Sequence, residues 1–107
     1  MSATVDILAT LTHDQAQQYV GTVFHLIHEG APVLELKLHD VAVLLGNRQR
    51  SSRQKRDPFA LYFTAPPPLL AQGIYKLAGE PVTFETLFIV PLSRNEDGTY
   101  EYEAVFT

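Results

Sequence analysis

The sequence predicts a small, mainly antiparallel β domain of about six strands with one short N-terminal helix. Three observations carry this prediction. Apolar and polar residues alternate with a period of two in several segments, as in strands with one buried face. Clusters of glycine and proline separate these segments at short intervals. The stretch 81–91 is rich in β-branched and aromatic residues and has a proline at each end, which predicts the central strand.

Length and composition indicate one folded domain over residues 1–107. Of the 107 residues 46% are hydrophobic and 19% are charged, which suits a chain with its own core. No apolar run approaches the roughly 20 residues of a membrane-spanning helix. The N-terminus lacks the basic and apolar regions of a signal peptide, so we expect a cytoplasmic protein. The chain has no cysteine, which excludes disulfides, thiolate metal sites and thiol nucleophiles.

A short helix is predicted from His13 to Val20. Thr12 followed by Gln15 forms the pattern of a capping box, and Gly21 provides the stop signal. Because a helix of this length is not stable alone, it must pack against the sheet.

Residues 22–28 and 33–45 predict a hairpin with a turn at 29–32. In its second strand the apolar residues recur in steps of two, except for a step of three between Leu38 and Val41. A β-bulge at His39 and Asp40 would keep both groups of apolar residues on the inner face. The inward residues are then Leu34, Leu36, Leu38, Val41, Val43 and Leu45.

Further strands are predicted at 59–63, 74–78 and 99–106. In the last one, Glu101 and Glu103 lie on the polar face. Residues 66–68 are all proline and lack the N–H that a strand ladder needs, so they must cross the domain outside the sheet. The pattern leaves open whether the strands close as a barrel or stack as a sandwich. If the sheet has edges, the apolar segment 74–78 is a candidate for pairing with a second copy.

Five of the eight basic residues of the chain lie within one polar segment, residues 46–57. They are Arg48, Arg50, Arg53, Lys55 and Arg56. With Asp57 the segment carries +4 in a chain of net charge -4, so the remainder carries -8. These five cations are the candidate partner-binding residues, for an acidic protein first and for nucleic-acid phosphates second, because the acidic remainder would repel a polyanion. A solvated loop without a binding role is the remaining interpretation.

No constellation of catalytic or metal-binding residues stands out. His25 and His28 are three residues apart, which puts them on opposite faces of a strand. Glu101 and Glu103 are about 7 Å apart on one face, a spacing compatible with paired-carboxylate hydrolysis, but alternation on a wet face explains them equally well. The chain has no nucleophile elbow and no phosphate-binding glycine loop. We therefore expect no enzyme, no cofactor and no metal.

Four blocks in the second half of the chain follow one another in a specific order and spacing. They are Phe59-x-Leu61-x-Phe63, Pro68-Leu69-Leu70-x-Gln72-Gly73-x-Tyr75, Phe84-x-x-Leu87-Phe88-Ile89-Val90-Pro91 and Tyr102-Glu103-Ala104-Val105-Phe106. This series resembles a family of small bacterial proteins known only as a domain of unknown function. The resemblance implies an occurrence near phage-tail-like proteins and supplies no catalytic residue. The basic segment departs from the family pattern.

Together these observations favour a non-enzymatic interaction or assembly protein with a protein partner, and the resemblance narrows this to an accessory of a phage-tail-like system. The contact candidates are the basic segment, the sheet edge and the proline crossing at 66–68. A barrel that binds a small apolar ligand is the first alternative. Nucleic-acid binding through residues 48–56 is the second, and self-association is left open.

Overall fold

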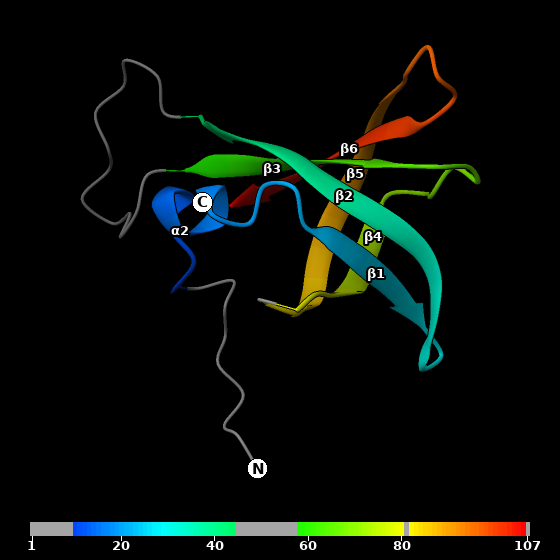
Figure 1. Cartoon of the computed structure of the whole chain (residues 1–107), viewed down its shortest axis with the longest axis horizontal. Coiled ribbons are helices and arrows are strands. Elements are labelled where there is room, and N and C mark those ends of the chain that lie inside the picture. Colours follow the sequence, from blue (N-terminus) through cyan, green and yellow to red (C-terminus); the bar gives the residue numbers. More distant parts are fainter. Residues whose placement is uncertain (1–9, 45–57, 81, 107) are drawn as a thin grey trace.

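The computed structural model describes residues 10–44, 58–80 and 82–106, and it shows six antiparallel strands that close a barrel, with one short helix beside it (Figure 1). The elements are α2 (His13–Gln17), β1 (Val23–His28), β2 (Ala31–Val43), β3 (Phe59–Ala65), β4 (Gly73–Ala78), β5 (Phe84–Arg94) and β6 (Tyr100–Phe106). The strand order around the barrel is β1-β2-β3-β6-β5-β4, and β4 closes on β1. The predicted antiparallel β fold is confirmed, and it is a barrel.

Helix α2 has the predicted capping box. The Gln15 N–H donates to the Thr12 hydroxyl at 3.2 Å, and the Gln15 side chain accepts from the Thr12 N–H at 3.1 Å. The helix ends at Gln17 rather than at Val20, because the next residues form a turn before Gly21. Gly21 has φ +98° and redirects the chain into β1, a backbone conformation that glycine adopts without steric cost.

The hairpin of β1 and β2 turns on two residues. Glu29 and Gly30 both have positive φ, 53° and 80°, as the tight turn between right-twisted strands requires. The turn is therefore tighter than the predicted 29–32, and β2 already begins at Ala31.

The predicted bulge in β2 is confirmed. Leu38 pairs with Phe63 and Asp40 pairs with Tyr62, so His39 is the extra residue between two consecutive pairs. The bulge preserves the inward phase on both sides of it, as the spacing of the apolar residues demands.

The inward residues of β2 follow the prediction except at the end of the strand. Leu36, Leu38 and Val41 are buried, and Leu34 packs against the core. Val43 is 48% exposed, which corrects the prediction, because β2 ends there and the barrel wall goes no further. Leu45 lies outside the described residues.

The central strand begins and ends later than predicted. β5 runs from Phe84 to Arg94 and passes through Pro91, which pairs with Tyr102 of β6. A shift of register between Pro91 and Ser93 lets the sheet accept a residue without an N–H. The strand is apolar on both faces over 87–90, but its outer face is not buried: Phe88 is 50% exposed.

Segment 74–78, the candidate edge if the sheet had one, is paired on both sides over part of its length because the barrel closes. β4 pairs with β5 on one side, and on the other side Lys76, Leu77 and Ala78 pair with β1. Only the first residues of β4 lack a partner on the β1 side, so the segment as a whole cannot serve as an edge strand for a second copy.

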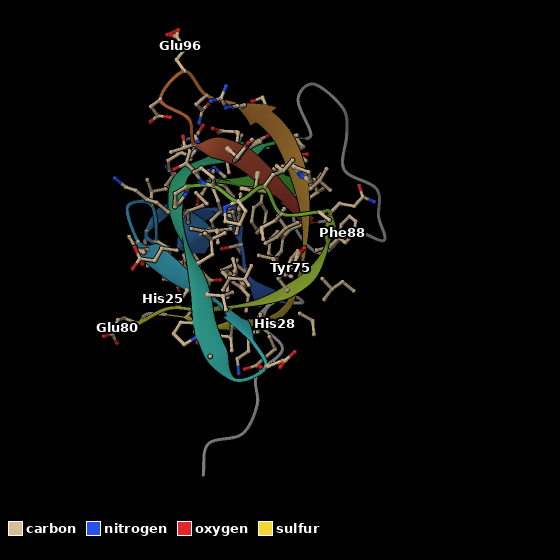
Figure 2. All side chains as sticks on the ribbon, turned by 90° about the vertical axis from the view of Figure 1, so that its right-hand side faces the viewer. His25, His28, Tyr75, Glu80, Phe88 and Glu96 are labelled. Carbon is tan, nitrogen blue, oxygen red and sulfur yellow. The ribbon has the colours of Figure 1, made fainter. Side chains whose placement is uncertain are left out.

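Aromatic side chains fill the barrel, and Figure 2 shows the space between the strands occupied by side chains. The ring of Phe24 lies 5.5 Å from that of Phe84 and 5.9 Å from that of Phe63, measured between centroids. The ring of Phe84 lies 6.2 Å from that of Phe106. Within the described residues every buried side chain is hydrophobic. These contacts bring together strands that are far apart in the sequence.

The first prediction concerns Gly79, which lies next to the core. A Cβ at this position would lie 2.6 Å from a ring carbon of Phe24 and 2.8 Å from the Val82 carbonyl oxygen. G79A should therefore lower the free energy of unfolding by about 1–3 kcal/mol. The matched control is G73A, where the nearest atom to the new Cβ, on Tyr75, is 3.7 Å away. Denaturant unfolding measures both, and equal stability of the two variants would contradict the close approach.

The second prediction concerns the buried hydroxyl of Tyr102, which accepts the N–H of Leu70 at 3.0 Å. This bond holds the segment after the prolines against the barrel. Y102F leaves the Leu70 N–H without its acceptor and should cost about 1–2 kcal/mol of stability, with faster amide exchange at Leu70. Tyr100 makes no side-chain hydrogen bond within the described residues, so Y100F is the control. Unchanged exchange at Leu70 in Y102F would show that the bond does not hold the segment.

Candidate functional site

Two adjoining hollows open on the outer surface along β2, with volumes of about 540 and 260 Å³. Both are lined by Glu35 and Pro66, and we call the pair the β2 groove. The other lining residues are His25, Pro32, Val33 and Leu34 in the larger hollow and Val23, Lys37, Thr64, Ala65 and Thr99 in the smaller one. The groove therefore brings together β1, β2, the end of β3 and the turn before β6.

The groove exists because β3 is shorter than the strand it pairs with. β2 lies beside β1 with its first half and beside β3 with its second half (Figure 1). Pairing with β3 begins at Lys37 and Thr64, and β3 ends at Ala65. Pro66 follows, and since proline has no N–H it does not extend the ladder. Within the part of the chain that the structure describes, residues 31–36 of β2 are thus paired with β1 alone.

Exposed aliphatic side chains supply the apolar part of the groove. Val33 on β2 is 56% exposed and Val23 on β1 is 41% exposed. Both point outward, because the residues that alternate with them, Phe24 on β1 and Leu34 on β2, pack in or against the core. Apolar surface of this kind on a rigid wall favours contact with another apolar group.

The titratable side chains of the groove are a neighbouring histidine and glutamate and one lysine. His25 and Glu35 are cross-strand neighbours, and His25 Nε2 lies 3.3 Å from Glu35 Oε2. Lys37, the next outward residue of β2, is exposed and makes no ion pair within the described part of the chain. Lys37 is therefore the charge in the groove that has no counterion there.

A hydrogen-bonded turn fixes the wall of the groove at Thr99. The Thr99 N–H and hydroxyl both donate to one carboxylate oxygen of Asp97, at 2.9 and 2.6 Å. The Asn95 amide donates to the Thr99 hydroxyl at 2.9 Å and to Glu101 at 3.3 Å, and Glu101 is also hydrogen-bonded to His39. The bonds from the Thr99 hydroxyl and N–H lower the pKa of Asp97.

The two glutamates of β6 take part in separate interactions. Glu101 contacts His39 and Asn95, whereas Glu103 accepts a hydrogen bond from the Tyr62 hydroxyl at 2.9 Å. Burial, followed by the hydrogen bond to Glu103, raises the pKa of Tyr62. Neither glutamate lines the β2 groove.

Each histidine in the described residues lies beside a carboxylate. His25 lies beside Glu35, His39 beside Glu101, His28 beside Glu29 at 3.2 Å and His13 beside Asp14 at 3.4 Å. Among the described residues no three acidic or histidine side chains converge as a metal site would require. His25 and His28 are both labelled in Figure 2, on β1.

Of the three contact candidates predicted from the sequence, the structure places the proline crossing at the groove. Pro66, the first residue of the proline crossing, lines both hollows of the groove. The free edge at 74–78 is lost to barrel closure, as described above. Arg48, Arg50, Arg53, Lys55 and Arg56 lie outside the described residues.

Sequence reasoning did not find Val23, Val33 and Lys37 as groove residues. Their signal was present, because two valines point outward from strands whose other face is buried. Their joint position depends on where β3 stops relative to β2, and the sequence pattern does not fix that point.

A second exposed apolar pair lies away from the groove. Ile74 of β4 and Phe88 of β5 are direct cross-strand neighbours and are 68% and 50% exposed. Phe88 is labelled in Figure 2. This pair provides a matched control surface for experiments on the groove.

The fold and site define a class: a closed six-stranded antiparallel barrel with an open groove on its outer wall. Residues 11–106 match DUF6916, a domain of unknown function, and the chain belongs to this family. Comparison with curated proteins and with solved structures found no match. In the described part of the chain no helix is long and apolar enough to cross a membrane.

The third prediction uses the lowered pKa of Asp97. Because this pKa is below its ordinary value of 3.8, the carboxylate stabilises the fold above that pH, and the contribution is lost as the pH falls through the folded-state pKa. D97N should lower the midpoint of thermal unfolding near pH 6, and its difference from wild type should shrink as the pH falls below 3.8.

The control for this titration is E96Q, an exposed neighbour in the same turn whose side chain makes no hydrogen bond within the described residues. Its unfolding midpoint should follow the wild type closely over the same pH range. A difference between D97N and wild type that stays constant with pH would contradict the role given to the charged form.

Proposed function

We propose that this protein is a non-enzymatic interaction module that binds a partner protein in the β2 groove. The observation that carries the proposal is the groove itself, whose larger hollow of about 540 Å³ combines exposed valine with charged side chains on a rigid barrel wall. Hollows of roughly 300–1,000 Å³ that mix apolar walls with a few polar groups are typical binding sites. An open form favours a protein segment over an enclosed small molecule.

The clearly shifted pKa values among the described residues have structural causes. Three of these residues, Tyr62, Asp97 and Tyr102, have clearly shifted pKa values. Each shift is explained by burial or by a hydrogen bond within the fold, and none of the three side chains lines the groove. Catalytic groups with perturbed pKa values usually lie in the cleft where the substrate binds.

The filled interior supports a surface role over the alternative of an internal apolar ligand. The ring of Phe24 packs against those of Phe63 and Phe84, and all three side chains are fully buried. A ligand inside the barrel would have to displace these side chains, at the cost of the packing that holds the strands together. The groove requires no such displacement.

Nucleic-acid binding through residues 48–56 is the second alternative. It predicts binding whose logarithm falls linearly with the logarithm of the salt concentration, with a smaller slope when Arg50, Arg53 and Arg56 become alanine. The net charge of -8 outside the basic segment works against a polyanion and favours a protein partner.

A narrower form of the proposal makes the chain an accessory of a phage-tail-like assembly. Its support is the sequence resemblance described above, since the family description names no function. Recovery of a tail-type structural protein in the following experiment would support the narrower form, and recovery of an unrelated partner would leave only the general one.

The fourth prediction tests the groove by capture from extracts of the source cell. V33E places a negative charge in the groove. I74E places the same charge on the exposed pair of Ile74 and Phe88, at a similarly exposed strand position away from the groove. Wild type and I74E should recover the same stoichiometric protein, identified by mass spectrometry, while V33E should lose it because a buried unpaired charge weakens the contact.

A third variant carries alanine at Arg48, Arg50, Arg53, Lys55 and Arg56. Loss of the partner by this variant alone would move the contact to the basic segment. Retention of the partner by V33E would exclude the groove, and absence of a partner for wild type would remove the proposed function.

A further inference from the structure

The β2 groove lies beside a stretch of strand with an open edge. β1 pairs with β2 from Ala31 to Lys37, but β3 pairs with β2 only from Lys37 onward. On the side of β3, residues 31–36 have no partner strand among the described residues. An open edge of this kind offers backbone donors and acceptors to an incoming chain.

The hydrogen bonds of Leu38 show which N–H and carbonyl groups of β2 point toward β1 and which point toward the open edge. The Leu38 N–H donates to the Thr22 carbonyl at 3.0 Å and its carbonyl accepts from the Gly21 N–H at 2.7 Å, so both groups point toward the β1 side. Backbone groups alternate in direction along a strand, so Leu36 also points toward β1. Glu35 then points its N–H and carbonyl toward the open edge, in the middle of the groove.

The side chains around this edge match an extended segment. In a strand added beside β2, alternate side chains would lie on the outer face, next to Val33 and Pro66. The other side chains would lie toward Leu34, which packs against the core. The groove thus offers an added strand apolar contacts at Val33, Leu34 and Pro66, with the charged side chains of Glu35 and Lys37 beside them.

The exposed Lys37 favours an incoming segment that carries a negative charge. Lys37 lies at the point where β3 begins to pair, is exposed, and makes no ion pair in the described part of the chain, whereas Glu35 lies beside His25. A carboxylate on the incoming segment is the group that complements it. A second copy paired symmetrically through the same edge about Glu35 would place two Glu35 side chains opposite each other, which is unfavourable.

Building on the proposed function, we infer that the partner contributes an extended segment that pairs with β2 along residues 34–36, between the register shift at Val33 and the start of the β3 pairing, as an added strand in line with β3. A carboxylate of this segment lies against Lys37. Main-chain hydrogen bonds to Glu35 supply affinity, and the alternating side chains together with Lys37 supply specificity.

The test selects short random peptides on the full chain and discards those that also bind V33E. The selected peptides should carry alternating aliphatic residues and one acidic residue. Binding should slow amide exchange at Glu35, as measured by NMR, and should be lost when alternate peptide amides are N-methylated.

K37E should weaken binding about threefold to tenfold, and changing the acidic residue of the peptide to lysine should restore it. I74E should bind like wild type.

The other outcomes separate this inference from the proposed function. Peptides that bind the groove but tolerate N-methylation and leave Glu35 exchange unchanged would overturn strand addition and leave groove binding intact. The same inference fails if K37E binds as tightly as wild type or if no selected peptide distinguishes wild type from V33E. Self-association through the edge would appear as a concentration-dependent mass that V33E abolishes, and it would also overturn the inference. The proposed function fails separately, when V33E retains the partner from extracts.

Discussion

The barrel depends on one strand, β2, which belongs to two pairings at once. Its first half pairs with β1 and its second half pairs with β3, and the bulge at His39 lies where the second pairing begins. Without the extra residue, the apolar side chains before and after the bulge would face opposite sides of the sheet. The bulge therefore makes it possible for one long strand to face the closed core on both sides of it, from Leu34 to Val41.

The same arrangement creates the site. A strand of 13 residues cannot be covered by a partner of 7, and Pro66 ends β3 where a longer strand would have continued. The exposed part of β2 carries a second register shift, in which Val33 is the extra residue opposite β1, and it is bordered by charged side chains and by proline. All three features are common at natural strand edges, where they limit pairing with other chains. The groove and the open edge thus have a single structural cause.

The polar outer face next to the groove is stiffened by its own contacts. His39 reaches Glu101 across β3, and Asn95 and Asp97 hold Thr99 in the turn before β6. These bonds fix one wall of the groove independently of any partner. A preformed wall loses little conformational entropy of its own when a partner binds, which favours recognition by the fold as it stands.

The sequence by itself determined the local features of this protein. The capping box at Thr12, the bulge at His39 and the inward phase of the last strand are set by residues close together in the chain, where periodicity and side-chain chemistry act directly. Only the tertiary structure decided that the strands close as a barrel, that β5 continues through Pro91, and that Val33, Lys37 and Pro66 meet in one groove. Those features depend on the register between strands far apart in the chain, and alternation within each strand does not fix that register.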